Sequence, residues 1–313
     1  MICLGLDTSN YTTSAAWFDG TAGENQGRLL EVAQGALGLR QSDALFQHVK
    51  RLPEVFHALG ALRGVGAVGA STRPRAVEGS YMPCFLAGEG HGRVLADALG
   101  VPFVSVSHQQ GHLAAAAWSA GRTDLLDAPM LAWHLSGGTT ELLLVTPQGW
   151  NVRAERIGGS SDISAGQLID RTGVLLGLPF PAGKGVDALS LRAEGGRGFP
   201  VRLDGLNFSL SGMENKVKQL AAQGRPEAEI ARFAVDTVAD VVCRATRAAQ
   251  ALHPGLPVLC SGGVASNTLL RQVLKGCGAC FAQPRYSTDN AMGVAILAHR
   301  ALERGEEGRY DGN

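Results

Sequence analysis

The fold is decided by the segment Met130-Leu-Ala-Trp-His-Leu-Ser-Gly-Gly-Thr-Thr-Glu-Leu-Leu-Leu-Val145. Its first apolar run predicts a strand over 130–135, and its second predicts a return strand over 141–145. The turn between them, residues 136–140, contains only Ser, Gly and Thr. A turn of this kind offers hydroxyl and backbone N–H groups to a phosphate, although an ordinary hairpin has the same pattern.

The same order of elements begins the chain. An apolar strand over 2–7 is followed by a Ser/Thr-rich turn over 8–14 and a second strand over 15–18. Two such hairpins, one in each half, resemble those with which actin-like ATPases (sugar kinases, heat-shock chaperones and their relatives) hold phosphates. The resemblance implies an α/β chain with two lobes, each a mixed sheet with flanking helices. The N-terminal lobe is expected over 1–127 and the C-terminal lobe over 128–313, whose final helix could pack back on the first lobe.

Length and charge limit the classes of function. A chain of 313 residues is long enough for two domains, and its 28 basic residues balance 28 acidic ones. This balance gives no overall electrostatic footprint for nucleic acid, so a local patch or a partner would have to supply contacts to RNA. No apolar run reaches 18 residues, no basic and apolar leader begins the chain, and the six cysteines are scattered. We therefore expect a cytoplasmic protein with no membrane contact.

Two histidines carry the strongest chemical signal. His108 and His112 follow the apolar run 102–107 and open an Ala-rich helix. Residues four apart share a helix face, so both imidazoles can point at one metal ion. Capping or hydrogen-bonding histidines are the alternative. Asp289, at a predicted strand-to-helix turn, is either a helix cap or a further metal ligand.

Other polar residues follow predicted strands. Asp7 ends the first strand, where it is placed to hold a metal or a water. Arg73 and Arg75 lie in the loop after a strand over 65–71 and could bind phosphate or carboxylate through their planar donor groups, or simply be solvated.

The second half contains two segments suited to a nucleotide. Asp170 and Asp187 bracket a loop rich in Gly and Pro, an arrangement that could grip a ribose, although either residue could be a helix cap. A strand over 257–260 leads through Gly262 and Gly263 to a helix N-terminus, which is a typical nucleotide-cradling junction.

Taken in chain order, these motifs resemble the TsaD/Gcp (YgjD/Kae-type) family of tRNA threonylcarbamoyladenosine transferases, once labelled glycoproteases. The resemblance covers nearly the whole chain. It rests on the following segments: Asp7-Thr-Ser9, His108-Gln-Gln-Gly-His112, Ser136-Gly-Gly138, Asp170, Gly183, Asp187, Phe208-Ser-Leu-Ser-Gly212, Gly262-Gly-Val-Ala-Ser-Asn267 and Ser287-Thr-Asp-Asn290.

The resemblance implies a ligand set and a reaction. One divalent metal, Fe²⁺ or Zn²⁺, would be bound by His108, His112 and Asp289. Threonylcarbamoyl-AMP or ATP would be bound by Ser136, Gly137, Gly138, Asp170, Gly183, Asp187, Gly262, Gly263 and Asn267, with Asp7 and Ser136 in the catalytic set. The threonylcarbamoyl group would pass to N6 of the adenosine next to the tRNA anticodon. TsaB-like and TsaE-like proteins are the implied partners, and a homo- or heterodimer is the implied assembly.

Peptidase activity is not expected. A metalloprotease with the H-E-x-x-H pattern needs a Glu beside the first histidine to deprotonate the attacking water. Gln109 and Gln110 occupy these positions, and an amide cannot act as a general base.

Several departures from the family pattern indicate a divergent paralogue. An acid that usually follows Asp-Thr-Ser is absent around Asn10 and Tyr11, Thr139 replaces a His, and Glu214 stands where the family has Lys. Two alternatives therefore remain beside tRNA modification. One is a carbamoyl or acyl transferase, or a nucleotide hydrolase, with another acceptor. The other is a non-catalytic scaffold that pairs with a true TsaD.

Overall fold

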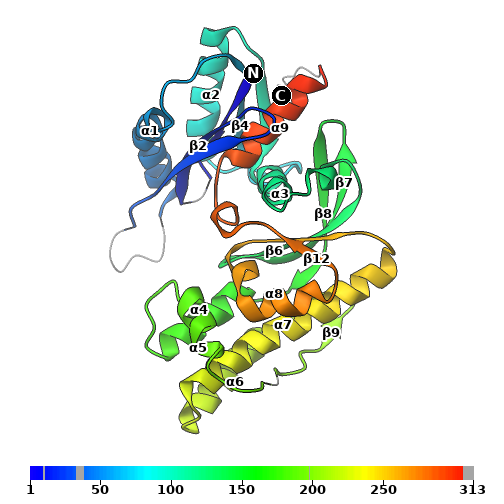
Figure 1. Cartoon of the computed structure of the whole chain (residues 1–313). Coiled ribbons are helices and arrows are strands. Elements are labelled where there is room, and N and C mark those ends of the chain that lie inside the picture. The colour runs from blue at the N-terminus through cyan, green and yellow to red at the C-terminus, as the bar shows by residue number, and fades with distance from the viewer. Residues whose placement is uncertain (10, 33–38, 197, 306–313) are drawn as a thin grey trace. The chain divides into compact units, whose positions relative to one another are not determined.

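The computed structural model describes residues 1–9, 11–32, 39–196 and 198–305 (Figure 1). The chain divides into two compact units. Unit 1 comprises Met1–Asp127, Thr146–Ala154 and Thr288–Asn313, and unit 2 comprises Ala128–Val145 and Glu155–Ser287. The sequence predicts a single cut after residue 127, whereas this division also assigns 146–154 and the C-terminal segment to unit 1.

Unit 1 is built on a five-stranded sheet with the order β3-β2-β1-β4-β5. Strand β1 is antiparallel to β2 and parallel to β4, which is parallel to β5. Strand β3 has no apolar period in the sequence, because it is polar and largely exposed at the sheet edge. The strands are β1 (Ile2–Asp7), β2 (Thr12–Phe18), β3 (Gly23–Leu29), β4 (Val65–Arg73) and β5 (Phe103–Ser107).

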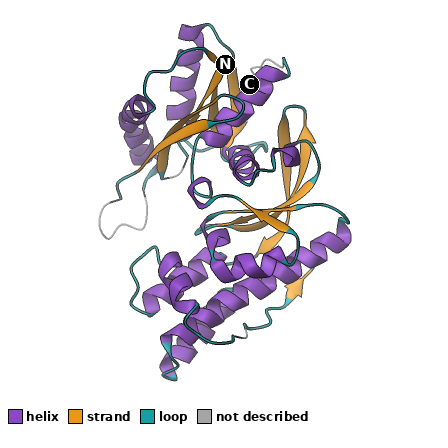
Figure 2. Ribbon diagram, viewed as in Figure 1, coloured by secondary structure: helices purple, strands orange, loops and turns teal. Residues whose placement is uncertain are grey.

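The helices of unit 1 cover both faces of this sheet (Figure 2). Leu6 of β1 packs with Leu52 of α1, and Leu4 packs with Ala96 of α2, so α1 and α2 lie on one face. Helix α9 lies on the opposite face of β1, where a Cβ added at Gly5 would lie 2.5 Å from Ala295 N. The helices are α1 (Gln41–Ala58), α2 (Phe85–Leu99), α3 (His108–Ser119), the short η1 (Thr123–Leu126) and α9 (Met292–Glu303).

Unit 2 repeats the topology of unit 1. Its sheet has the order β12-β11-β6-β7-β8-β10-β9, so β8-β7-β6-β11-β12 corresponds to β3-β2-β1-β4-β5. As in unit 1, the central strand β6 is antiparallel to the strand that follows it and parallel to β11. The strands are β6 (Met130–Leu135), β7 (Thr140–Gln148), β8 (Asn151–Ser160), β9 (Leu203–Asp204), β10 (Asn207–Phe208), β11 (Val258–Ser261) and β12 (Ala279–Phe281).

One large apolar core holds unit 2 together. Trp133 of β6 is buried in it, and its indole N–H donates to Thr246 Oγ1 of α7 at 2.9 Å, so the polar edge of the ring is satisfied inside the core. The helices are α4 (Ala165–Leu175), α5 (Gly183–Ser190), α6 (Ser211–Ala222), α7 (Glu227–Leu252) and α8 (Thr268–Lys275), with the short η2 (Gly263–Ser266) and η3 (Pro284–Tyr286). Among the described residues, no helix is long and apolar enough to cross a membrane.

Candidate metal centre

The start of α3 presents the two histidines. Ser107 caps this helix by accepting a hydrogen bond from Gln110 N at 3.2 Å, while Gln110 Oε1 accepts one from Ser107 N at 2.8 Å. This reciprocal capping box satisfies two backbone N–H groups that the first turn would otherwise leave unpaired. Gln110 Nε2 also donates to Val152 O at 2.8 Å. The glutamine that cannot serve as a protease base therefore fixes where the helix begins.

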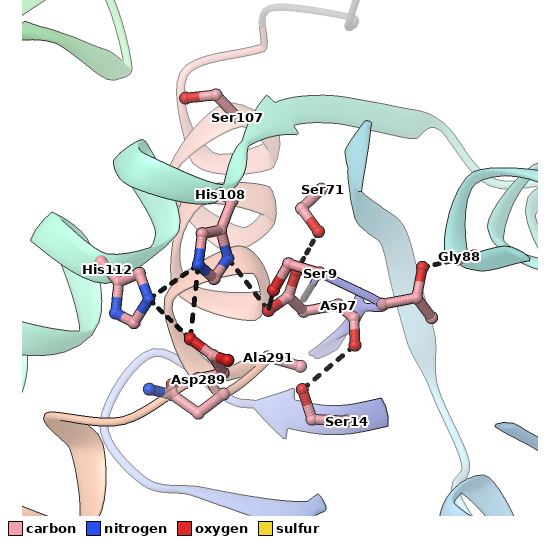
Figure 3. A network of polar contacts seen from close by, with 12 residues as sticks. Asp7, Ser9, Ser14, Ser71, Gly88, Ser107, His108, His112, Asp289 and Ala291 are labelled. Atoms are coloured by element: carbon pink, nitrogen blue, oxygen red, sulfur yellow. Dashed lines mark hydrogen bonds and ion pairs between the residues drawn. The ribbon is translucent and has the colours of Figure 1, made fainter. Parts of the chain in front are cut away.

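His108, His112 and Asp289 converge within unit 1 (Figure 3). The two Nε2 atoms lie 2.9 Å apart, and Asp289 Oδ1 lies 3.3 Å from His112 Nε2 and 3.5 Å from His108 Nε2. All three side chains are partly exposed, between 10% and 21%. A ligand could therefore reach the point on which they converge.

These separations fit one metal ion. Bonds of about 2.1 Å at right angles would place neighbouring ligand atoms about 3.0 Å apart, and a tetrahedral arrangement about 3.4 Å apart. The observed 2.9 to 3.5 Å spans these values. Two borderline imidazole nitrogens and one harder carboxylate oxygen suit Fe²⁺ or Zn²⁺, and three protein ligands leave positions open, as in catalytic sites.

A second carboxylate stands behind the first histidine. Asp7 Oδ2 lies 3.1 Å from His108 Nδ1, on the side of the ring opposite to His112 and Asp289 (Figure 3). Asp7 is therefore not one of the converging ligands, although the sequence places it where it could hold a metal. Metal-binding histidines almost always carry such a partner on the other ring nitrogen.

The charges of the cluster favour a cation. Burial opposes protonation of His108, but the carboxylates of Asp7 and Asp289 outweigh it and raise the pKa of His108 to about 10. Burial likewise opposes ionisation of the two carboxyls. Their interactions with the histidines prevail, so the pKa values of Asp7 and Asp289 lie below the ordinary range. Two ionised carboxylates thus surround a position where positive charge is stabilised.

Close packing of two helices holds the ligands in register. Gly293, in the first turn of α9, lies against Gly111 of α3, and a Cβ added at Gly293 would lie 1.7 Å from Gly111 O. Asn290 supports the same turn by accepting a hydrogen bond from Met292 N at 3.1 Å. Asp289 immediately precedes this turn, so its position depends on how closely α9 approaches α3.

The predicted nucleotide residues all lie in unit 2. The turn after β6 is closed by Thr139 N, which donates to Ser136 Oγ at 3.0 Å. Gly137 and Gly138 are exposed, and a Cβ added at either would meet nothing within 4 Å, so a ligand can approach their backbone. The same openness holds at Gly183 and Gly263.

Three other predicted residues accept hydrogen bonds from the backbone at or just before the start of a helix. Asp170 Oδ1 accepts from Ala182 N at 2.8 Å, just before α5. Asp187 accepts from Thr268 N at 2.9 Å and from Thr268 Oγ1 at 2.8 Å, at the start of α8. Asn267 Oδ1 accepts from Leu270 N at 3.0 Å in the same helix. These backbone contacts are compatible with either alternative that the sequence leaves open for the two aspartates, a ligand contact or a structural role. Gly262 has a φ of +94° against Leu135 O, a conformation that requires glycine.

Sequence reasoning missed Asp162, which organises the loop between β10 and α6. Its carboxylate accepts from Ser209 Oγ at 2.5 Å, Leu210 N at 2.8 Å and Ser211 N at 3.2 Å. Burial disfavours the charged form, but these hydrogen bonds prevail and hold the pKa of Asp162 well below its ordinary value. An aspartate followed at a distance by a Ser-x-Ser segment gives no sequence signal that the two will meet.

We expect Asp162→Ala to destabilise the protein by about 1–2 kcal/mol at pH 7, because one cap serves several donors. A carboxyl whose pKa is lowered on folding stabilises fully above its unfolded pKa of about 4, and the effect disappears as the pH falls below that value. The difference in unfolding free energy between wild type and variant should therefore shrink below about pH 4. Urea titrations from pH 7 to pH 3 measure it, with the exposed Asp204→Ala as control. A difference independent of pH would contradict this role.

The duplicated sheets and the two-histidine, one-carboxylate cluster define the class of protein: an α/β chain of the actin-like ATPase fold with a candidate metal centre. Two solved structures of HypF are similar, with TM-scores of 0.63 and 0.60 at 14% and 15% identity. They match 96% and 98% of this chain, which spans about half of each HypF chain, 46% and 49%. A Listeria monocytogenes protein described as an N-acetylmannosamine kinase has a TM-score of 0.51 at 10% identity, covering 97% of this chain and all of that one. The predicted fold is thereby confirmed.

Sequence comparison identifies the family. Residues 79–296 match the family model of TsaD, tRNA N6-adenosine threonylcarbamoyltransferase. A protein of that name from Thermus thermophilus is 35% identical over 262 residues, covering 81% of this chain and 73% of its own length. Another, from Rhizobium etli, is 33% identical over 96% of this chain and 88% of its own. The chain belongs to the TsaD family, as its motifs predict.

Proposed function

We propose that this protein transfers the threonylcarbamoyl group from threonylcarbamoyl-AMP to N6 of the adenosine adjacent to the tRNA anticodon, with one divalent metal, Fe²⁺ or Zn²⁺. The observation that carries the proposal is the convergence of His108, His112 and Asp289 in a member of the TsaD family. A bound cation would polarise acyl or phosphate oxygens as a Lewis acid. Peptidase activity is not part of the proposal, because Gln109 and Gln110 cannot act as general bases.

The proposed roles of the protein groups follow from their chemistry. In unit 1, the three ligands bind the metal. In unit 2, the open backbone at Gly137 and Gly138, with Ser136, is suited to bind phosphate or acyl oxygens of the donor and to stabilise charge that develops on them. The glycine junction after β11 is suited to the adenine nucleotide. Asp170, Asp187 and Asn267 would then position the segments that meet the nucleoside, since their carbonyl or carboxylate oxygens already bind the backbone.

The proposed setting is the cytoplasm, with tRNA and with TsaB-like and TsaE-like proteins as partners. The six cysteines are scattered along the chain, without the spacing typical of a disulfide framework. The even balance of 28 basic and 28 acidic residues favours a shared contact with tRNA over binding by this chain alone.

A donor-consumption assay tests the proposal. Purified protein, loaded with Fe²⁺ or Zn²⁺ and supplied with the partner proteins, receives threonylcarbamoyl-AMP with or without unmodified tRNA. We expect AMP release that depends on tRNA and is lost when the acceptor adenosine is replaced by guanosine. AMP release that is indifferent to tRNA would instead indicate a hydrolase or another acceptor.

Transfer to a different acceptor is the second candidate, and one structural feature favours it. Arg73 ends β4 and Arg75 lies in the loop that follows; both are exposed, and the loop contacts the start of α3, where Gln109 N donates to Pro74 O at 3.1 Å. Guanidinium groups at the end of β4 and in this loop suit a small acceptor that carries a carboxylate or phosphate.

Glu214 tests which surface meets RNA. This residue of α6 forms an ion pair with Arg171 of α4 at 2.5 Å and another with Lys218 of α6 at 2.7 Å. It therefore neutralises two cations. If this face contacts tRNA, Glu214→Lys should strengthen binding several-fold at low salt and steepen its salt dependence, because three cations would then adjoin. Filter binding over a salt series measures the effect, with Glu194→Lys as the control. Unchanged affinity at every salt concentration would rule this face out.

A further inference from the structure

Asp7 ends β1 with a side chain that is 1% exposed and fully engaged. Its Oδ1 accepts a hydrogen bond from Ser71 Oγ of β4. Its Oδ2 accepts one from Ser9 Oγ at 2.8 Å and lies 3.1 Å from His108 Nδ1. Both oxygens are therefore committed to protein groups. Because the side chain is also 1% exposed, a substrate cannot reach this carboxylate directly.

His108 lies between Asp7 and the other two converging ligands, His112 and Asp289 (Figure 3). Its Nδ1 faces Asp7, while its Nε2 lies 2.9 Å from His112 Nε2. From this order we infer that Asp7 is a positioning residue that acts through His108 and does not touch substrate, contrary to its expected place in the catalytic set. The inference rests on the proposed metal centre.

The chemistry of imidazole gives the reason. A neutral imidazole binds a metal through the nitrogen that carries no proton, so Nε2 can ligate only when the proton is on Nδ1. A carboxylate facing Nδ1 selects that tautomer and makes Nε2 a stronger ligand. The edge of Phe85 lies against the same ring, with centroids 6.3 Å apart, so the orientation of His108 is set from two sides.

Ser71 holds Asp7 in place from a neighbouring strand. Ser71 lies on β4, and its hydroxyl fixes one oxygen of Asp7, leaving the other to face His108. Ser71 is fully buried, and the part of β4 in which it lies is regular up to a register shift at Ser71–Arg73. Loss of this hydroxyl should loosen Asp7 without changing its charge. We therefore expect the Asp7 variant to lose more metal affinity than the Ser71 variant.

Cobalt binding tests the inference, because Co²⁺ reports coordination by its visible absorption and needs no turnover. We expect Asp7→Asn to weaken Co²⁺ binding by about 10- to 100-fold, the range typical of such outer partners. Asparagine has the same shape, but its NH₂ group facing Nδ1 would favour the tautomer with the proton on Nε2, which cannot ligate. Ser71→Ala should weaken binding less, by several-fold. Asp97→Asn, the same change on the exposed face of α2, should have no effect.

The melting temperature of each metal-free protein is recorded alongside, since a merely structural role would lower it without a specific change in the Co²⁺ spectrum. Asp7→Asn that binds Co²⁺ as tightly as wild type would overturn the inference. If Asp7→Asn does not fold, Ser71→Ala decides, and wild-type affinity in that variant would also overturn it. If wild-type protein does not bind Co²⁺, both the proposed metal centre and this inference are wrong. Transfer to tRNA is tested separately, by the tRNA-dependent release of AMP.

Discussion

His112→Ala is expected to reduce bound metal from about one equivalent to nearly none and to slow threonylcarbamoyl transfer by at least about a hundredfold. Two ligands would remain, His108 and Asp289, and two ligands seldom hold a divalent ion against water. Asp289→Ala should act in the same way. The fold should be retained, because these side chains are partly exposed and lie outside the apolar clusters of unit 1.

Elemental analysis of the purified proteins, with circular dichroism to check the fold, measures this outcome. His57→Ala is the matched control, since this histidine is exposed on α1 of the same unit. Full metal occupancy in both His112→Ala and Asp289→Ala would show that the metal, if present, is bound elsewhere.

The second large effect is expected at the crossing of α3 and α9. Gly293→Ala would place a Cβ 1.7 Å from Gly111 O and 2.9 Å from Ala115 N, both of which are backbone atoms that cannot rotate away. The helices must separate, so we expect a loss of about 3 kcal/mol or more in the free energy of unfolding. Since α3 carries both histidines and Asp289 precedes α9, metal affinity should fall as well.

Gly90→Ala on the exposed face of α2 is the control, because a Cβ there meets nothing within 4 Å. It should stabilise the protein by about 0.5–1 kcal/mol, the gain of a better helix former. Chemical denaturation and a metal titration on both variants measure the two effects. A Gly293→Ala protein with wild-type stability would show that the helices do not approach as closely as the structure indicates.

Local patterns account for what the sequence could predict. The apolar runs of β1 and β6 and their hydroxyl-rich turns predict the repeated hairpins, and the spacing of His108 and His112 predicts that they share a helix face. Both features depend on a few neighbouring residues, whose apolar period and composition determine the local secondary structure. The long polar run of β3 has no such period, and it forms a strand only because β2 offers it a partner edge.

Contacts between distant segments account for the rest. Ser71 of β4 donates a hydrogen bond to Asp7 of β1. Asp162 accepts hydrogen bonds from Ser209 and Leu210, which lie in another loop. Whether Asp187 grips a ligand or caps a helix depends on the position of Thr268, 81 residues away in the chain. A single sequence gives the residue types but not the tertiary contacts between distant residues. The alternatives at such positions therefore stay open until the fold is known.

The departures from the family pattern concern different parts of the fold. His108, His112 and Asp289 keep the geometry of an open metal site, which a scaffold protein would not need. Thr139 lies in the turn after β6, and Glu214 of α6 pairs with Arg171 of α4 and with Lys218 of its own helix. The retained ligands are those proposed to bind the metal, whereas Thr139 adjoins the turn proposed to bind the donor. Identity of the acceptor is the point at which we expect this chain to differ from its relatives.

The most direct measurement is nucleoside analysis of the reaction product. Wild type and His112→Ala are each incubated with threonylcarbamoyl-AMP, unmodified tRNA, metal and the TsaB-like and TsaE-like partners, and the tRNA is then digested and examined by mass spectrometry. We predict threonylcarbamoyladenosine from the wild type and almost none from His112→Ala. Donor consumed by the wild type without any modified adenosine would contradict transfer to tRNA.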